Sequence, residues 1–117
     1  MVTVTGTIFK TRLQDGDASA TEAEYSLETA IDLLNTYGAG LDSLTGDAGS
    51  KTGSYTSAEA GAIWTMAREV YKVHWKNADG ASSAVGAVNM SAVNDTYLLR
   101  MARQLARQLA TKNFQRA

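Results

Sequence analysis

Hydrophobic positions recur with the spacing of an α-helix in three segments, which predicts helices over residues 21–37, 57–79 and 92–113. The three apolar stripes comprise Ala23, Leu27, Ile31 and Leu34; Ala60, Ile63, Ala67, Val70 and His74; and Leu98, Met101, Leu105 and Leu109. The second helix carries a further stripe beside the first, formed by Trp64, Tyr71 and Trp75. Because it is apolar over the widest arc, we predict that it is central and packed on two sides.

Polar residues mark where these helices begin and end. Residues 21–24 and 56–59 both have the Thr-x-x-Glu spacing of a capping box, in which a hydroxyl and a carboxylate each accept a free backbone N–H. Gly38 and Gly80 follow the first two helices and are predicted to stop them.

The N-terminal segment has a different pattern. In residues 2–9, Val and Ile alternate with Thr, which predicts a strand or an extended arm within residues 1–13. Its backbone groups would pair either with a short local strand or with a neighbouring subunit, and the alternative is a frayed terminus that pairs with nothing. Val2, Val4 and Ile8 would share one face and Phe9 would lie on the other, so these four are candidate interface residues.

Two glycine-rich segments, residues 38–56 and 80–91, are predicted to be loops. The first holds half of the ten glycines and is long for a compact domain, so we expect it to be mobile or ordered by a partner. The expected fold is mainly α: a single domain over residues 1–117, with three helices, an N-terminal β-strand or extended arm, and long loops.

The composition limits how large a core the chain can build. Ile, Leu, Val and Phe together make up only 22 of 117 residues, whereas Ala, Gly, Ser and Thr supply 51. A lone monomer of this composition would be only marginally stable, and burial against copies of itself or a partner would remedy that. No apolar segment approaches the roughly 20 residues that span a bilayer, and the N-terminus lacks a secretory signal pattern. We therefore expect a soluble protein that is not exported and has no membrane partner.

Charge is almost balanced overall but segregated along the chain. The net charge is −1, yet residues 1–50 carry 2 basic and 8 acidic groups, and residues 51–117 carry 9 basic and 4 acidic groups. The balance excludes polybasic nucleic-acid tails and highly acidic proteins. A protomer with one acidic and one basic region suits head-to-tail packing in a ring.

Motifs for catalysis or for cofactor binding are missing from the sequence. There is no Cys and only one His, which disfavours metal sites and paired-His mechanisms. Lys51 lies in a glycine-rich loop, but it follows Ser50 and so breaks the Walker spacing of a phosphate-binding loop. Asp42 and Asp47 lack the spacing of a calcium loop. We therefore predict a protein that is not an enzyme and that needs no metal or cofactor.

The last predicted helix carries a row of basic residues opposite its apolar stripe. The row comprises Arg100, Arg103 and Arg107, with Lys112, Phe114 and Arg116 beyond it, and no acidic residue follows Thr96. Three interpretations stay open: an acidic protein surface, nucleic-acid phosphates, or a solvated helix face. A sequence pI near 5.7 disfavours nucleic acid as the main ligand.

The arrangement of these elements resembles the small head–tail connector (adaptor) proteins of tailed viruses. The likeness is most evident over residues 21–79, in the segments 26–37 and 57–78 separated by a polar loop, and extends to residues 95–113. It implies a ring of copies in the virion neck, assembled in the host cytoplasm. The ring would join the portal protein to a tail or stopper protein, and viral DNA would pass through it. The resemblance also implies that Arg107, Lys112, Phe114 and Arg116 contact the portal.

Two other functions fit the same residues. One is a small DNA-binding regulator that uses the basic C-terminal helix, for which we expect steeply salt-dependent binding to duplex DNA. The other is a different virion protein, either a capsid-decorating or a tail-completion protein.

Overall fold

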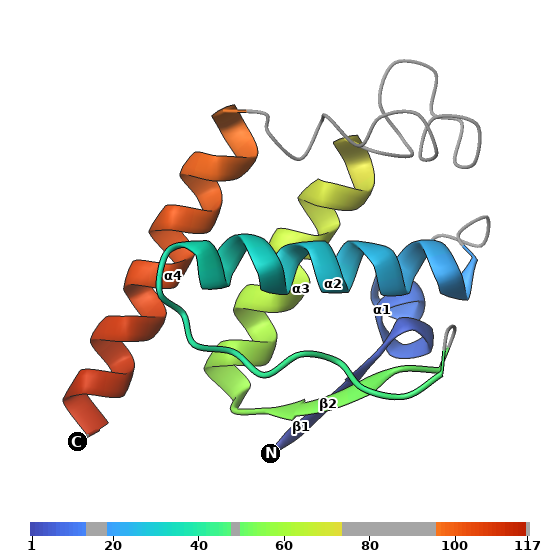
Figure 1. The fold of residues 1–117 in the computed structure, drawn as a ribbon, viewed down its shortest axis with the longest axis horizontal. Helices are drawn as coiled ribbons and strands as arrows, with labels where there is room; N and C mark the ends of the chain where they lie inside the picture. The colour runs from blue at the N-terminus through green and yellow to red at the C-terminus, as the bar shows by residue number, and fades with distance from the viewer. Residues whose placement is uncertain (14–18, 48–49, 74–95, 117) are drawn as a thin grey trace.

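The computed structural model describes residues 1–13, 19–47, 50–73 and 96–116 (Figure 1). The elements in chain order are β1 (Val2–Thr5), α1 (Gly6–Leu13), α2 (Ala20–Thr36), β2 (Thr52–Tyr55), α3 (Ser57–Tyr71) and α4 (Thr96–Arg116). The predicted mainly α fold with an N-terminal strand is confirmed. The described residues hold four helices instead of three, because α1 lies in the segment predicted as an extended arm.

The helices are arranged around the crossing of α2 over α3 (Figure 1). α4 packs against both of these helices on one side, α1 packs against α2 on the other, and the β1–β2 hairpin lies next to α3. One core cluster receives buried side chains from every element, including Val4 of β1, Phe9 of α1 and Tyr55 of β2. The described elements therefore share a single hydrophobic core.

Small residues let α2 and α3 approach each other closely. Ala23 and Ala30 of α2 and Ala60 and Ala67 of α3 have no exposed surface. Larger side chains fill the space between them: Leu27, Ile31, Leu34, Ile63, Met66 and Val70 are also fully or almost fully buried. The buried set of α3 covers a wide arc, which confirms the prediction that this helix is central.

The N-terminal strand pairs within the chain. β1 and β2 are antiparallel, with Val2 opposite Tyr55 and Thr5 opposite Thr52. Of the two pairings that the sequence left open, the structure therefore has the local one. The predicted loop over 38–56 was wrong at its end, because β2 occupies Thr52–Tyr55. The four residues of β2 include a single bulky apolar side chain, so no alternation marked them as a strand.

The second half of the predicted arm is a helix. Alternation of Val and Thr stops at Gly6, and the Thr5 hydroxyl accepts the backbone N–H of Ile8 at 3.1 Å, as an N-terminal cap does. The change from strand to helix breaks up the predicted faces: Val4 and Phe9 are both fully buried, whereas Ile8 is 37% exposed.

The N-terminus of α2 is capped two residues earlier than predicted. The Ser19 hydroxyl accepts the N–H of Glu22, and the Glu22 carboxylate accepts the N–H of Ser19, both at 3.0 Å. The predicted box at residues 21–24 was therefore wrong, because the same spacing occurs twice and the earlier copy forms the cap. The second box, with Thr56 and Glu59 before α3, is confirmed.

Gly38 ends α2 as predicted, in a Schellman arrangement. Its φ is +90°, its N–H donates to the carbonyl of Asn35, and the N–H of Ala39 donates to the carbonyl of Leu34. The Asn35 side chain then holds the following loop: its amide donates to the carbonyl of Leu41 at 2.9 Å and accepts the N–H of Leu41 at 2.7 Å. The loop after α2 is thereby fixed against the end of the helix.

The two longest predicted helices are described only in part. α3 is described from Ser57 to Tyr71, and residues 74–79 of the predicted helix, with His74, lie outside the described residues. The same is true of the predicted loop 80–91, of Gly80 and of the predicted start of the last helix at residue 92. α4 continues to Arg116, three residues beyond its predicted end.

Tyr55 joins the hairpin to the loop that follows α2. Its ring is buried, and its hydroxyl donates to the carbonyl oxygen of Asp42 at 2.6 Å. Burial, with the nearby Asp42 and Glu59 carboxylates, raises the pKa of Tyr55 to about 12. The neutral phenol is thus the form that the fold stabilises.

The cap of α2 gives a first prediction. Ser19→Ala removes the acceptor for the Glu22 N–H and should lower the free energy of unfolding by about 1 kcal/mol. Thr21→Ala, the matched control at the position that the sequence suggested, should change it by less than about 0.5 kcal/mol because Thr21 is exposed. Urea unfolding monitored by circular dichroism measures both; a larger effect at Thr21 would contradict the assigned cap.

A second prediction compares two glycines. A Cβ at Gly53 would lie 2.8 Å from the buried ring and hydroxyl of Tyr55, so Gly53→Ala should destabilise the fold by about 1–3 kcal/mol. A Cβ at Gly61, inside α3, would meet no atom within 4 Å, so Gly61→Ala should stabilise by about 0.5–1 kcal/mol. Thermal unfolding of the two variants should shift the midpoint in opposite directions, and equal shifts would argue against the described position of Tyr55.

Candidate interaction surfaces

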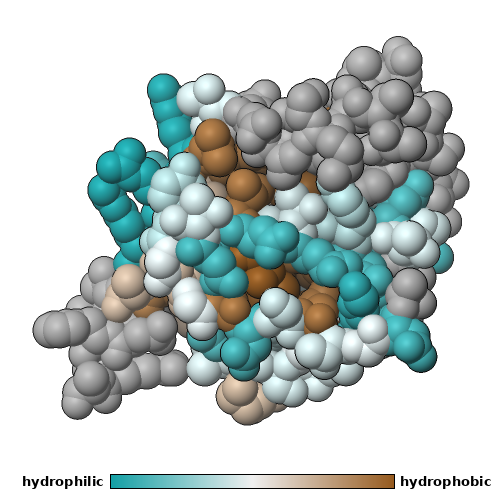
Figure 2. All heavy atoms as spheres, in the orientation of Figure 1, coloured by the Kyte–Doolittle hydropathy of each residue, from teal (hydrophilic) through white to brown (hydrophobic). Residues whose placement is uncertain are grey.

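α4 presents one apolar and one basic face. Leu98, Ala102, Ala106 and Leu109 are buried against α2 and α3. Arg100, Arg103 and Arg107, which we call the arginine row, are all exposed on the opposite side. Figure 2 shows hydrophilic side chains projecting from the edge of the molecule that α4 forms. The sequence prediction of a basic outward face is confirmed by this placement.

The arginine row has no ion-pair partner in the described part of the chain. The ion pairs found there join Lys51 to Glu28 at 3.2 Å and Lys72 to Glu69 at 3.4 Å. Glu69 also accepts the hydroxyl of Tyr97 at 2.9 Å, a bond that links α3 to α4 and raises the pKa of that phenol. Glu69 is therefore engaged by Lys72 and Tyr97 and not by the arginine row.

A small acidic hollow lies between α2 and the loop that follows it. It has a volume of about 40 Å³ and is lined by Glu28, Ile31, Asp32, Ser43 and Leu44. Ile31 and Leu44 are buried beneath it, whereas Asp32 is exposed. In the described residues the Asp32 carboxylate has neither a hydrogen bond nor an ion pair, since only its backbone carbonyl accepts a bond, from Thr36. We call these five residues the acidic hollow.

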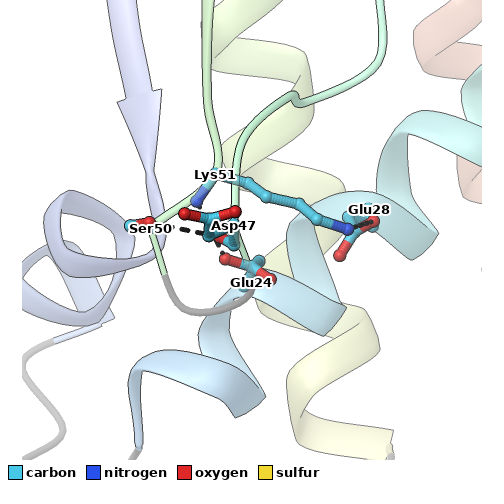
Figure 3. A network of polar contacts seen from close by, with 5 residues as sticks. All are labelled: Glu24, Glu28, Asp47, Ser50 and Lys51. Atoms are coloured by element: carbon cyan, nitrogen blue, oxygen red, sulfur yellow. Dashed lines mark hydrogen bonds and ion pairs between the residues drawn. The ribbon is translucent and has the colours of Figure 1, made fainter.

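Lys51 is bound by carboxylates of α2, as Figure 3 shows. Its backbone N–H donates to Oε2 of Glu24 at 3.1 Å, and its ammonium group donates to Oε2 of Glu28 at 3.2 Å. Glu24 is only 4% exposed. Nearby, the N–H and hydroxyl of Ser50 donate to the carbonyl oxygen of Asp47. The negative charges of Glu24 and Glu28 disfavour a phosphate group beside Lys51. Their two bonds to Lys51 instead tie the start of β2 to α2.

A larger groove runs between α3 and α4. It has a volume of about 240 Å³ and is lined by Ala58, Gly61, Ala62, Thr65, Leu105, Gln108 and Leu109. Its walls are mostly small uncharged side chains, so the groove has few groups that could select a ligand by hydrogen bonds or charge.

Arg12 of α1 contacts Trp64 of α3. The Arg12 guanidinium carbon stacks 3.5 Å from the ring centre of Trp64 and holds α1 in place.

The four N-terminal interface candidates differ in their exposure to solvent. Val4 and Phe9 are fully buried in the chain's own core, so neither has side-chain surface for a partner and both leave the predicted interface. The reason is local: pairing with β2 turns Val4 inward, and the helical form of α1 turns Phe9 inward. Val2 is half-buried against the core, and Ile8 is exposed. Of these four candidates, Ile8 is the one whose side chain is exposed in the structure.

Lys112, Phe114 and Arg116, the remaining C-terminal candidates, belong to the end of α4. The side chains of Lys112, Phe114 and Arg116 lie outside the described part of α4. The sequence also missed two features of the surface, the acidic hollow and the stacking of Arg12 on Trp64. Both join residues far apart in the chain, and no local spacing signals such a contact.

No family model matches the chain, and neither a curated protein nor a solved structure is significantly similar to it. Within the described residues, no three His, Asp or Glu side chains are grouped as metal ligands. None of the described helices is long and apolar enough to cross a membrane. The arginine row and the acidic hollow are therefore the features of the chain that bear on its function.

The tie around Lys51 gives a third prediction. Glu24→Ala leaves the part-buried backbone N–H of Lys51 without its acceptor and should lower the free energy of unfolding by about 1–3 kcal/mol. Glu28→Ala removes only a partly exposed ion pair and should lower it by less than about 1 kcal/mol. Urea unfolding of both variants decides the order, and a greater loss for Glu28→Ala would refute the role given to Glu24.

Proposed function

We propose that this chain is a structural subunit that assembles head to tail into a closed ring in the neck of a tailed virus. There it joins the portal protein to a tail or stopper protein, and viral DNA passes through the ring. The observation that carries the proposal is the placement of unpaired charge: the arginine row projects from α4, and the acidic hollow lies at another surface of the same protomer. A protomer of this kind favours contacts between unlike surfaces of neighbouring copies.

The small helical fold supports the same role. α4 buries one face in the core and presents the other along its described length, so it can serve as a rigid docking edge. The C-terminal residues of α4, with Lys112, Phe114 and Arg116, are proposed to reach the portal, as the resemblance to connector proteins implies. The proposed mechanism is geometric and non-enzymatic: folded copies dock by their charged faces, and the ring positions the partners above and below it.

A DNA-binding regulator is the second candidate. The three guanidinium groups of the arginine row are exposed and lie on one helical face, which suits contact with phosphates. The two candidates differ in what high salt removes, namely self-association in the first and duplex binding in the second. A capsid-decorating or tail-completion protein would share the self-association and is separated from a connector by imaging its position on the virion.

The fourth prediction concerns the native mass of the purified chain. We expect a single closed oligomer at low ionic strength, seen by native mass spectrometry and as annular particles by electron microscopy, and a shift towards monomer as salt screens the exposed charges. A strict monomer that binds duplex DNA with a steep loss of affinity in salt would contradict the ring and favour the regulator.

A further inference from the structure

The arginine row lacks an anionic partner within its own protomer. Its three side chains are exposed, and the described carboxylates that form ion pairs bind Lys51 and Lys72 instead. The arginine residues are separated by three and four positions, so they rise along one face of α4 over about 10 Å. Neighbouring like charges of this kind repel one another until an acidic surface neutralises them.

The acidic hollow has the features that a guanidinium group recognises. The carboxylates of Glu28 and Asp32 stand at its rim, Ser43 adds a hydroxyl, and Ile31 and Leu44 form an apolar floor. An arginine side chain presents the matching parts, a planar cation with several N–H donors at the end of an aliphatic stem. Asp32 has no ion pair among the described residues, and Glu28 uses Oε2 for Lys51, which leaves its Oε1 as an acceptor.

The spacing of the two surfaces also matches. Glu28 and Asp32 are four residues apart on α2, and so are Arg103 and Arg107 on α4. Each pair therefore spans about 6 Å along its helix axis. When α4 of one copy lies along α2 of another, both charge pairs can form in a single register. Within one protomer the row faces away from the core and no described ion pair joins it to the hollow.

We propose that the arginine row of one copy docks in the acidic hollow of the next copy, with Arg103 and Arg107 facing Glu28 and Asp32. The occupant is a second copy of this chain, chosen because the two surfaces are complementary in charge and in helical spacing. The contact joins two different surfaces, so a docked pair keeps one row and one hollow free for further neighbours, as ring closure requires. The inference deepens the proposed ring and rests on it.

The fifth prediction uses two neutralised variants, R103Q/R107Q and D32N, with R68Q and D47N as matched controls. Both controls remove an exposed charge outside the proposed contact. Circular dichroism first verifies that all variants are folded. In native mass spectrometry at low salt, the concentration for half-assembly should rise by up to about fivefold for D32N, which loses one exposed charge pair, and by about tenfold for R103Q/R107Q, which loses two, and it should stay unchanged for each control.

Mixing the two test variants gives the sharpest readout. R103Q/R107Q keeps a native hollow and D32N keeps a native row, so one native contact can form between them and no second one can close the ring. We expect 1:1 dimers in the mixture at concentrations where each variant alone is monomeric.

Three outcomes overturn the inference in different ways. Rings of wild-type stability in both test variants place the contact elsewhere and leave the proposed ring standing. Loss of assembly in R103Q/R107Q with none in D32N assigns the row to another surface. A wild-type chain that is monomeric under all conditions, and loses duplex binding in R103Q/R107Q, overturns both the contact and the proposed ring.

Discussion

The crossing of α2 over α3 positions every other element of the fold. Alanines at the contact let the two helices approach, and a small set of larger side chains, among them Leu27, Ile31 and Met66, fills the space between them. Since the chain has few bulky residues, this close approach is how it builds a core at all. α1 packs on α2, the hairpin packs on α3, and α4 packs on both helices. The stability of the whole depends on that contact.

The same constraint places the charges that we assign to assembly. Each helix has one apolar face, and the core uses it: α4 buries Leu98, Ala102, Ala106 and Leu109, and α2 buries the stripe through Ile31. The arginine row and Asp32 are thereby left outside, on different surfaces. Folding itself thus separates basic from acidic surface, and no further device is needed to give the protomer two unlike faces.

Patterns within one helix predicted well, whereas contacts between distant segments did not. The helical period predicted the buried and basic faces of α4, and Gly38 marked the end of α2. The strand β2 was missed because it depends on pairing with β1 across about fifty residues, anchored by Tyr55. The acidic hollow was missed for the same reason, since Leu44 reaches it only when the loop folds back on α2. Local alternation also gave no warning that Gly6 begins a helix.

Hydrogen exchange of backbone amides tests the central role of the α2–α3 contact most directly. If this pair is the foundation of the fold, amides in the middle of α2 and α3 should exchange slowest, at the rate of global unfolding, and those of α1 and the hairpin should exchange through smaller openings. Slowest exchange in α4 or in the hairpin, with α2 and α3 opening before them, would contradict the account.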